Sequence, residues 1–208
     1  MTNRLLTADG ARSGPATLEL QSKLLASLID EPEPDRRLRV FDAGPADSST
    51  VNFFSRYRCH LYFADLYAEP VLIEQREEFD EAVLTQRFRE LLDFPAGTAF
   101  DICLFWDFFN YLSQPALRAF SAAFADFIAP GAKAYCLGAM KRAKIHPNLR
   151  YGILGSDLIR MTELPERRLP NNPHSQSELK AMLSGLTVRK SILMPDGRLE
   201  MLLEAKQD

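Results

Sequence analysis

The stretch 38–66 constrains the fold of this chain more than any other (LRVFDAGPADSSTVNFFSRYRCHLYFADL). It predicts a short apolar strand ending at Asp42, a tight turn at Gly44, a helix, and a second strand ending at Asp65. A glycine after the first strand lets the backbone turn sharply and pass close to a ligand. Asp65 follows Gly44 by 21 residues, a spacing at which a carboxylate can accept hydrogen bonds from both hydroxyls of a ribose. The stretch therefore predicts the front half of a nucleotide-binding α/β unit.

Apolar strands and helices continue to alternate through the rest of the chain. A continuous apolar run at 102–106 predicts a strand covered on both faces. A helix is expected over 115–128, a strand over 132–140, and a further helix beginning at Ser175 or Ser177. LTVRKSIL and RLEMLLEA, separated by the turn MPDG, predict a terminal hairpin. This order predicts an α/β, Rossmann-like three-layer sandwich, with a mostly parallel seven-stranded sheet and a C-terminal antiparallel hairpin.

Three segments fit this alternation less directly. Leucines at helical spacing predict an amphipathic helix over 16–30, so residues 1–37 are expected to form a lead-in and 38–208 the main domain. A helical rhythm in the acidic stretch 69–93 predicts one or two surface helices, and a third parallel strand is placed near 91–94. Residues 141–175 contain four prolines and are expected to be an irregular insertion, with a weak helix at 157–161.

Composition limits the class of protein. The chain has 208 residues, of which 46% are hydrophobic, which suits one globular domain, and its fourteen phenylalanines predict an aromatic-rich core. The net charge of −3 provides no basic field for nucleic acid, and no apolar run is long enough to cross a membrane. The scattered cysteines at 59, 103 and 136 indicate reduced thiols and a cytoplasmic location, and their spacing predicts no metal site.

In the order of these motifs, the chain resembles the class I S-adenosylmethionine-dependent methyltransferases. The resemblance covers about residues 38–205 and includes the DAGPAD turn, the acidic end of the second strand, the run FDICLFWDFFNYL, and the C-terminal helix and hairpin. It implies S-adenosylmethionine as the cofactor and an unidentified small molecule as the methyl acceptor. A small-molecule substrate or a protein is thus the expected partner, and a homodimer is a further expectation.

The resemblance also implies roles for particular residues. Those expected to contact the cofactor lie at strand ends and in the turns that follow: Asp42, Gly44, Ala46, Asp65, Leu66, Asp93, Phe94 and Trp106. The first three would shape the methionine end, Asp65 would hold the ribose, and Asp93 with Phe94 would hold the adenine. The residues expected to bind the substrate follow the strand that ends at Trp106: Asp107, Asn110 and Tyr111. No catalytic residue is assigned, because methyl transfer from an activated cofactor depends mainly on positioning.

Two other functions are open at this stage. The turn carries Ala46 and Ser48 where methyltransferase turns usually carry more glycine, and the chain has no recognised catalytic signature such as an NPPY-type tetrad. These features favour a catalytically inactive methyltransferase-like protein, a pseudoenzyme that serves as a binding or regulatory module. A nicotinamide-dependent oxidoreductase would require G-x-G-x-x-G, and positions 46 and 49 are Ala and Ser.

Overall fold

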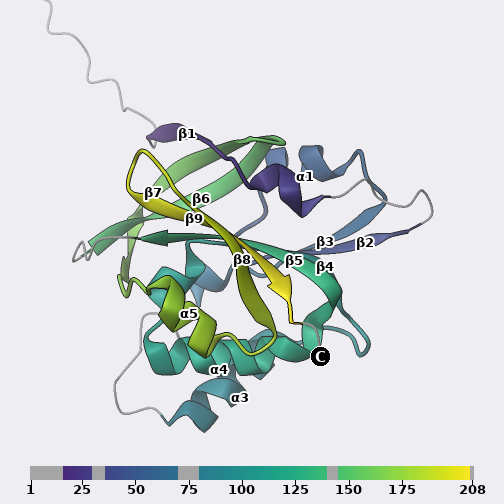
Figure 1. The fold of residues 1–208 in the computed structure, drawn as a ribbon, viewed down its shortest axis with the longest axis vertical. Helices are drawn as coiled ribbons and strands as arrows, with labels where there is room; N and C mark the ends of the chain where they lie inside the picture. The colour runs from purple at the N-terminus through teal and green to yellow at the C-terminus, as the bar shows by residue number, and fades with distance from the viewer. Residues whose placement is uncertain (1–15, 30–35, 70–79, 140–144, 207–208) are drawn as a thin grey trace, which may run out of the picture.

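A six-stranded mixed sheet forms the centre of the protein, in the order β3-β2-β4-β5-β9-β8 (Figure 1). The computed structural model describes residues 16–29, 36–69, 80–139 and 145–206. The strands of this sheet are β2 (Leu38–Asp42), β3 (Cys59–Phe63), β4 (Phe100–Trp106), β5 (Ile128–Ala139), β8 (Leu186–Leu193) and β9 (Arg198–Ala205). Strands β3, β2, β4 and β5 are parallel, and β9 runs antiparallel to both β5 and β8.

The sheet confirms the Rossmann-like alternation and the terminal hairpin and corrects the strand count. Within the described residues the central sheet has six strands rather than seven. The third parallel strand expected near 91–94 is wrong, because Leu91 is the last residue of helix α3 (Glu81–Leu91) and the chain then turns toward β4. Residues 70–79 of the acidic stretch lie outside the described residues.

Helices cover the sheet on the side shown below it in Figure 1, where α3, α4 (Gln114–Phe124) and α5 (Gln176–Met182) lie. Each begins at a residue whose side chain accepts a hydrogen bond from the first turn, namely Asp80, Ser113 and Ser175. Short 3-10 turns complete the connections: η2 (Leu66–Ala68), η3 (Phe108–Tyr111) and η4 (Ala125–Phe127). The predicted helices at 115–128 and after Ser175 are confirmed.

The opposite side of the sheet carries α1 (Ser48–Phe54) and a second, three-stranded sheet that the sequence did not predict (Figure 1). This small sheet has the order β1-β7-β6 and is antiparallel, with β1 (Thr17–Gln21), β6 (Ile145–Gly155) and β7 (Leu158–Pro170). The amphipathic helix expected over 16–30 is therefore wrong, and η1 (Leu25–Leu28) is its only helical part in the described residues. The weak helix at 157–161 is also wrong.

Strand periodicity explains both corrections. In β7, Ile159 and Met161 are buried while Arg160 between them is partly exposed, which is the two-residue alternation of a strand. Leu18 and Leu20 of β1 have the same spacing, and each pairs across to β7, with Met161 and Ile159 respectively. The leucine spacing in 16–30 was compatible with either period, and pairing with β7 selected the strand.

Two hydrophobic cores lie on the two sides of the central sheet. The helix-side core is rich in aromatic rings, as the phenylalanine count predicted: Phe41 contacts Phe100 and Phe124 at ring-centroid distances of 5.3 and 4.7 Å. The other core joins the central sheet to α1, η1 and the small sheet. The three cysteines are free thiols, and burial raises the pKa of Cys103 and Cys136.

A buried carboxylate holds the N-terminal segment against the central sheet. Glu200 on β9 is fully buried and accepts hydrogen bonds from the Ser22 hydroxyl, from the Tyr135 hydroxyl at 2.8 Å, and from the backbone N–H groups of Lys23 and Leu24. The two backbone N–H groups immediately precede η1, where a helical turn offers them no acceptor of its own. Glu200 therefore fixes the segment from which β1 joins the small sheet.

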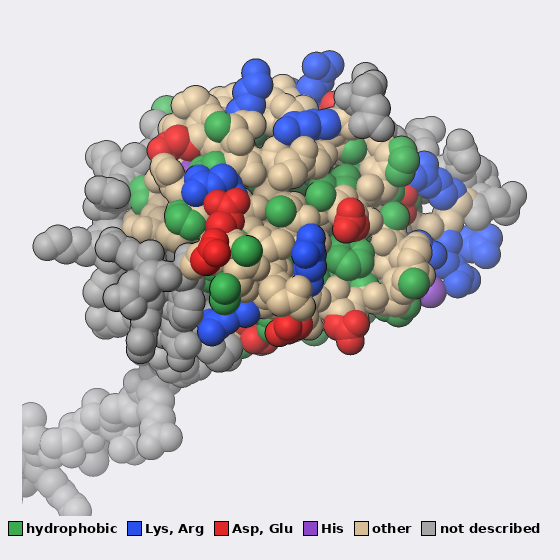
Figure 2. All heavy atoms as spheres, turned by 90° about the horizontal axis from the view of Figure 1, so that it is seen from below, with side chains coloured by type: hydrophobic (Ala, Val, Ile, Leu, Met, Phe, Trp, Pro, Cys, Tyr) green, Lys and Arg blue, Asp and Glu red, His purple; other side chains and the backbone are tan. Residues whose placement is uncertain are grey.

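Surface charge is mixed. On the face seen in Figure 2, acidic and basic side chains are interspersed, with Lys and Arg gathered at one end. A polar cavity lined by Arg37, Arg39 and His60 lies at the amino ends of β2 and β3. Among the described residues, no helix combines the length and apolar character that a membrane span requires.

Candidate functional site

The turn after β2 folds as the sequence predicted. Asp42 is buried, and its Oδ1 accepts a hydrogen bond of 2.8 Å from the backbone N–H of Gly44. A Cβ atom on Gly44 would lie 3.2 Å from the same oxygen, so the turn leaves little room for a side chain. Asp47 then caps α1 by accepting from the Ser49 N–H at 2.9 Å.

Trp106 covers this turn. The residue ends β4 in the left-handed region, with φ at 50°, a conformation that a bulky side chain rarely adopts. Its indole Nε1 donates a hydrogen bond of 2.7 Å to Asp42 Oδ1, and its Cδ1 would lie 3.7 Å from a Cβ on Gly44. Burial raises the pKa of Asp42 from 3.8 to about 7, while the hydrogen bonds from Gly44 and Trp106 act to lower it.

Asp65 lies next to the same turn, as the spacing predicted. It follows β3 in a left-handed conformation, with φ at 42°, and its backbone N–H bonds to the Gly44 carbonyl at 3.2 Å. The residue is partly exposed, whereas the neighbouring Leu66 is buried in the helix-side core. The structure thus brings Asp42, Gly44 and Asp65 together, and it places the Leu66 side chain in the core rather than at a cofactor surface.

Three other expected cofactor contacts are placed differently. The Phe94 ring packs against Phe100 and Phe127 at 5.1 and 5.2 Å, near the amino end of β4, and Asp93 is exposed beside it. Asp42 and Asp65 lie at the carboxyl ends of β2 and β3, so the structure does not bring Asp93 and Phe94 to the same place as these two residues. Ala46 is exposed and lines an open polar cavity together with Arg150 and Arg160, and Trp106 is not among the residues that line this cavity.

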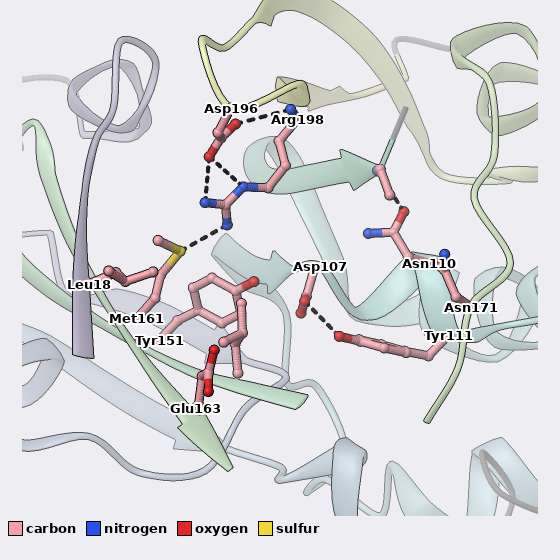
Figure 3. Close-up of a pocket in the computed structure, with 12 residues that line it drawn as sticks. Leu18, Asp107, Asn110, Tyr111, Tyr151, Met161, Glu163, Asn171, Asp196 and Arg198 are labelled. Carbon is pink, nitrogen blue, oxygen red and sulfur yellow. Dashed lines mark hydrogen bonds and ion pairs between the residues drawn. The ribbon is translucent and has the colours of Figure 1, made fainter. Parts of the chain in front are cut away.

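Asp107, the next residue after Trp106, forms the centre of a buried polar cluster (Figure 3). Its two carboxyl oxygens accept hydrogen bonds from the hydroxyls of Tyr67, at 2.9 Å, and Tyr111, at 2.8 Å. Burial raises the pKa of Asp107, and these hydrogen bonds act to lower it. Burial likewise raises the pKa of both tyrosines, and the nearby Asp107 charge adds to this effect.

A cavity of about 260 Å³ opens beside this cluster. The expected substrate residues Asp107, Asn110 and Tyr111 all line it, so the structure brings these three together. Both polar atoms of the Asn110 side chain are hydrogen-bonded to β5. Its Nδ2 donates to the Leu137 carbonyl at 2.8 Å, and its Oδ1 accepts from the Ala139 N–H at 3.1 Å. Asn110 therefore shapes the cavity wall, while the carboxyl group of Asp107 faces the space.

The remaining walls come from residues that sequence reasoning missed. Tyr151 and Leu149 of β6 pair across to Met161 and Glu163 of β7, so one face of the small sheet presents all four to the cavity. Two further residues line the cavity: Asp196 from the turn between β8 and β9, and Arg198, the first residue of β9. The alternation of apolar and polar residues in LIRMTE (158–163) could have predicted a strand there. The four prolines of 141–175 instead favour an irregular insertion.

Tyr151 joins the cavity to the covered turn. Its ring stacks on the Trp106 indole with a centroid distance of 5.1 Å and an interplanar angle of 6°. The next residue, Gly152, packs so closely on the N-terminus of α1 that an added Cβ would collide with Asp47 and Ser49. Arg160, which pairs with Gly152 across the small sheet, bonds to Asp47 Oδ1 at 3.0 Å. Strand β6 therefore lies directly over the turn that follows β2.

S-adenosylmethionine, the cofactor that the sequence resemblance implies, fits one end of this site and not the other. Asp65 is partly exposed beside the turn, where a ribose would be held, with its Oδ1 atom buried. At the methionine end, the Asp42 carboxyl group is already bonded to Gly44 and Trp106, and the Trp106 indole lies over the turn. The methionine end is thus closed in this conformation. Among the described residues, no group of three His, Cys, Asp or Glu is arranged to hold a metal ion.

The topology defines a Rossmann-like α/β protein, in which Asp42, Gly44 and Asp65 lie together at the carboxyl ends of neighbouring strands. No protein-family model and no curated protein sequence matches this chain. Among solved structures it is similar to the 1,6-didemethyltoxoflavin-N1-methyltransferase of Burkholderia thailandensis (16% identity, 83% of this chain and 72% of that chain, TM-score 0.45). It is also similar to a Pyrococcus horikoshii protein (14% identity, 82% of this chain and 83% of that chain, TM-score 0.49). A third similar structure is an S-adenosylmethionine-dependent methyltransferase of Clostridium acetobutylicum (10% identity, 88% of this chain and 87% of that chain, TM-score 0.45). Similarity at this level assigns neither substrate nor site residues.

Proposed function

We propose that this protein is an S-adenosylmethionine-dependent methyltransferase that acts on a small-molecule acceptor. The observation that supports the proposal is the adjacency of two half-sites at the carboxyl edge of the sheet. Asp42, Gly44 and Asp65 form the nucleoside-type half-site. Asp107, one residue after Trp106, lines the neighbouring cavity, which forms the second half-site. Open α/β sheets bind their ligands at this edge.

Cofactor binding in this proposal requires a local rearrangement. The Trp106 indole has to leave Asp42 Oδ1, which frees the carboxyl group and the space over Gly44. Asp65 would then hold the ribose, and the acceptor would occupy the cavity lined by Asp107 and Tyr111. The residues of the chain itself supply binding and positioning, which is the main requirement of methyl transfer.

Isothermal titration calorimetry of the full chain with S-adenosylhomocysteine tests the proposal. We expect saturable binding at one site and quenching of Trp106 fluorescence, since this residue is the one tryptophan of the chain and covers the turn. No heat and no change in melting temperature at millimolar ligand would contradict it. Asp65→Asn provides a matched variant, because it removes the charge and keeps a residue type that tolerates φ above zero.

A specific observation favours a second function, a catalytically inactive binding module built on the same fold. Trp106, Tyr151 and strand β6 close the methionine end, while the cavity beside Asp107 is open. A protein of this kind would bind a small molecule in the cavity without using the cofactor. Ligand binding in the cavity together with no response to S-adenosylhomocysteine supports this function, and methyl transfer to any acceptor excludes it.

A further inference from the structure

The charges around the Asp107 cavity are unbalanced. Three carboxyl groups line it, those of Asp107, Glu163 and Asp196, against the one guanidinium of Arg198 among the described lining residues. Arg198 is already paired with Asp196, whose Oδ2 accepts from Nε at 2.8 Å and from Nη2 at 2.5 Å (Figure 3). Arg198 also lies close enough to Asp107 for the two charges to interact, so one guanidinium faces three carboxyl groups and Glu163 has no counter-ion among the described residues that line the cavity.

The Tyr151 hydroxyl is an independent sign of a ligand. Tyr151 is 4% exposed, and its hydroxyl makes no hydrogen bond of normal geometry to a described residue, although it lies close enough to the Asp107 carboxyl group to interact with it. Figure 3 shows this hydroxyl directed toward the Asp107 side of the cavity. Burial raises the pKa of Tyr151, and so does the nearby charge of Asp107. A buried hydroxyl without a partner carries a free-energy cost that a ligand donor or acceptor would remove.

The other walls of the cavity are apolar. Leu18, Met161 and Tyr151 form a row across the three strands of the small sheet, because Met161 pairs with both of the other two. Leu149 and Ala139 extend this apolar lining. A volume of about 260 Å³ limits the occupant to a compact molecule, smaller than most drug-sized ligands.

We propose that this cavity binds a compact organic ammonium ion, with its nitrogen between Asp107 and Glu163 and its apolar body against Leu149 and Met161. The ammonium group would supply a counter-ion for Glu163, further positive charge beside Asp107, and a hydrogen-bond donor for the Tyr151 oxygen. It would also favour the ionised form of Asp107, since an opposite charge nearby offsets the effect of burial. The proposal goes beyond methyl transfer and applies equally to the active and inactive forms of the proposed function.

Binding of three probes of matched shape tests the charge preference without any cofactor. Benzylamine, benzyl alcohol and benzoate are titrated into the full chain, with calorimetry and Trp106 fluorescence as readouts. Trp106 reports on the cavity because its indole stacks on Tyr151. We expect benzylamine to bind at least about tenfold more tightly than benzyl alcohol, since a charge-assisted hydrogen bond contributes more than a neutral one. Benzoate should bind most weakly.

Three variants locate the binding. Glu163→Gln should weaken benzylamine about tenfold and leave benzyl alcohol unchanged, and Tyr151→Phe should weaken both ligands while retaining the ring stack. Glu90→Gln, on the exposed face of α3, is the matched control and should change neither. Equal affinity for amine and alcohol, or an unchanged amine affinity in Glu163→Gln, would overturn the proposal. Binding of S-adenosylhomocysteine without any amine preference would overturn this proposal alone and leave the proposed function standing.

Discussion

The indole Nε1 of Trp106 donates a hydrogen bond to Asp42 Oδ1 across 2.7 Å, and this bond links the ends of two parallel strands. It occupies the carboxyl group that the sequence marks for the methionine end of a cofactor. The Tyr151 ring stacks on the Trp106 indole, so strand β6 of the small sheet also takes part in covering the turn. In the function proposed above, the bond between Trp106 and Asp42 has to break before the cofactor can bind.

Removing the indole should open the half-site. We expect Trp106→Ala to bind S-adenosylhomocysteine about tenfold more tightly than the parent protein, because about 1.4 kcal/mol spent in moving the indole corresponds to that factor. Trp106→Phe keeps an aromatic ring over Gly44, so its affinity for S-adenosylhomocysteine should increase less. Calorimetry measures both affinities, with circular dichroism to verify folding. Weaker binding by a folded Trp106→Ala would show that the indole contributes to the cofactor site.

Substitution of Asp65 should show at which edge of the sheet the nucleoside binds. Asp65→Asn is expected to weaken S-adenosylhomocysteine binding by roughly 10- to 100-fold, since hydrogen bonds to a charged group contribute about 1.5–3 kcal/mol. Asp93→Asn is the control, because Asp93 is exposed beside Phe94 at the amino edge. Equal losses in the two variants would contradict the placement of the nucleoside beside Gly44.

Asp42 should make stability depend on pH. Its pKa is raised from 3.8 to about 7, so across this range the native state holds a proton that the unfolded chain releases. The free energy of unfolding should therefore fall as pH rises through this window, by up to about 4 kcal/mol at 1.36 kcal/mol for each unit. Urea unfolding at pH 5 and pH 8 measures the change. Asp42→Asn should reduce the change and leave the part due to other buried acids such as Asp107, whereas the exposed Asp126→Asn should not alter it; an unchanged slope in Asp42→Asn would refute this origin.

Glu200 should be essential for docking the N-terminal segment. Glu200→Ala leaves the hydroxyls of Ser22 and Tyr135 and two backbone N–H groups without their acceptor, and we expect a loss of about 3 kcal/mol or more. Glu204→Ala, on the same strand, removes only a half-exposed ion pair with Arg189 and should cost less than about 1 kcal/mol. Chemical denaturation measures both. Limited proteolysis should cut the Glu200 variant near 21–29; an intact segment there would argue against this role.

The contact of Gly152 with α1 should hold β6 over the turn. Gly152→Ala places a methyl group against Asp47 and Ser49, and we expect it to destabilise the protein by about 1–3 kcal/mol. Gly155→Ala on the same strand meets only ordinary contacts, the nearest at 3.8 Å, and should be nearly neutral. Thermal unfolding of the two variants gives the comparison. Similar melting temperatures would mean that β6 moves away from α1 at little cost.

The sequence by itself determined the central α/β unit. Short apolar runs bounded by Gly44, Asp65 and Pro115 identified β2, β3, β4 and α4, because local turn chemistry and burial of neighbouring strands depend on adjacent residues. The same reasoning placed Asp107, Asn110 and Tyr111 at one cavity, since the carboxyl ends of parallel strands share an edge.

Only the tertiary structure decided the small sheet and the state of the half-site. The pairing of 17–21 with 158–162 joins segments about 140 residues apart, and the two-residue period becomes decisive only once these strands meet. The same long-range pairing brings Tyr151 onto Trp106 and Gly152 onto Asp47. Local sequence specified a turn able to approach a nucleoside, and contacts from a distant hairpin determined that this turn is covered, because side-chain packing between distant segments has no signature in either one alone.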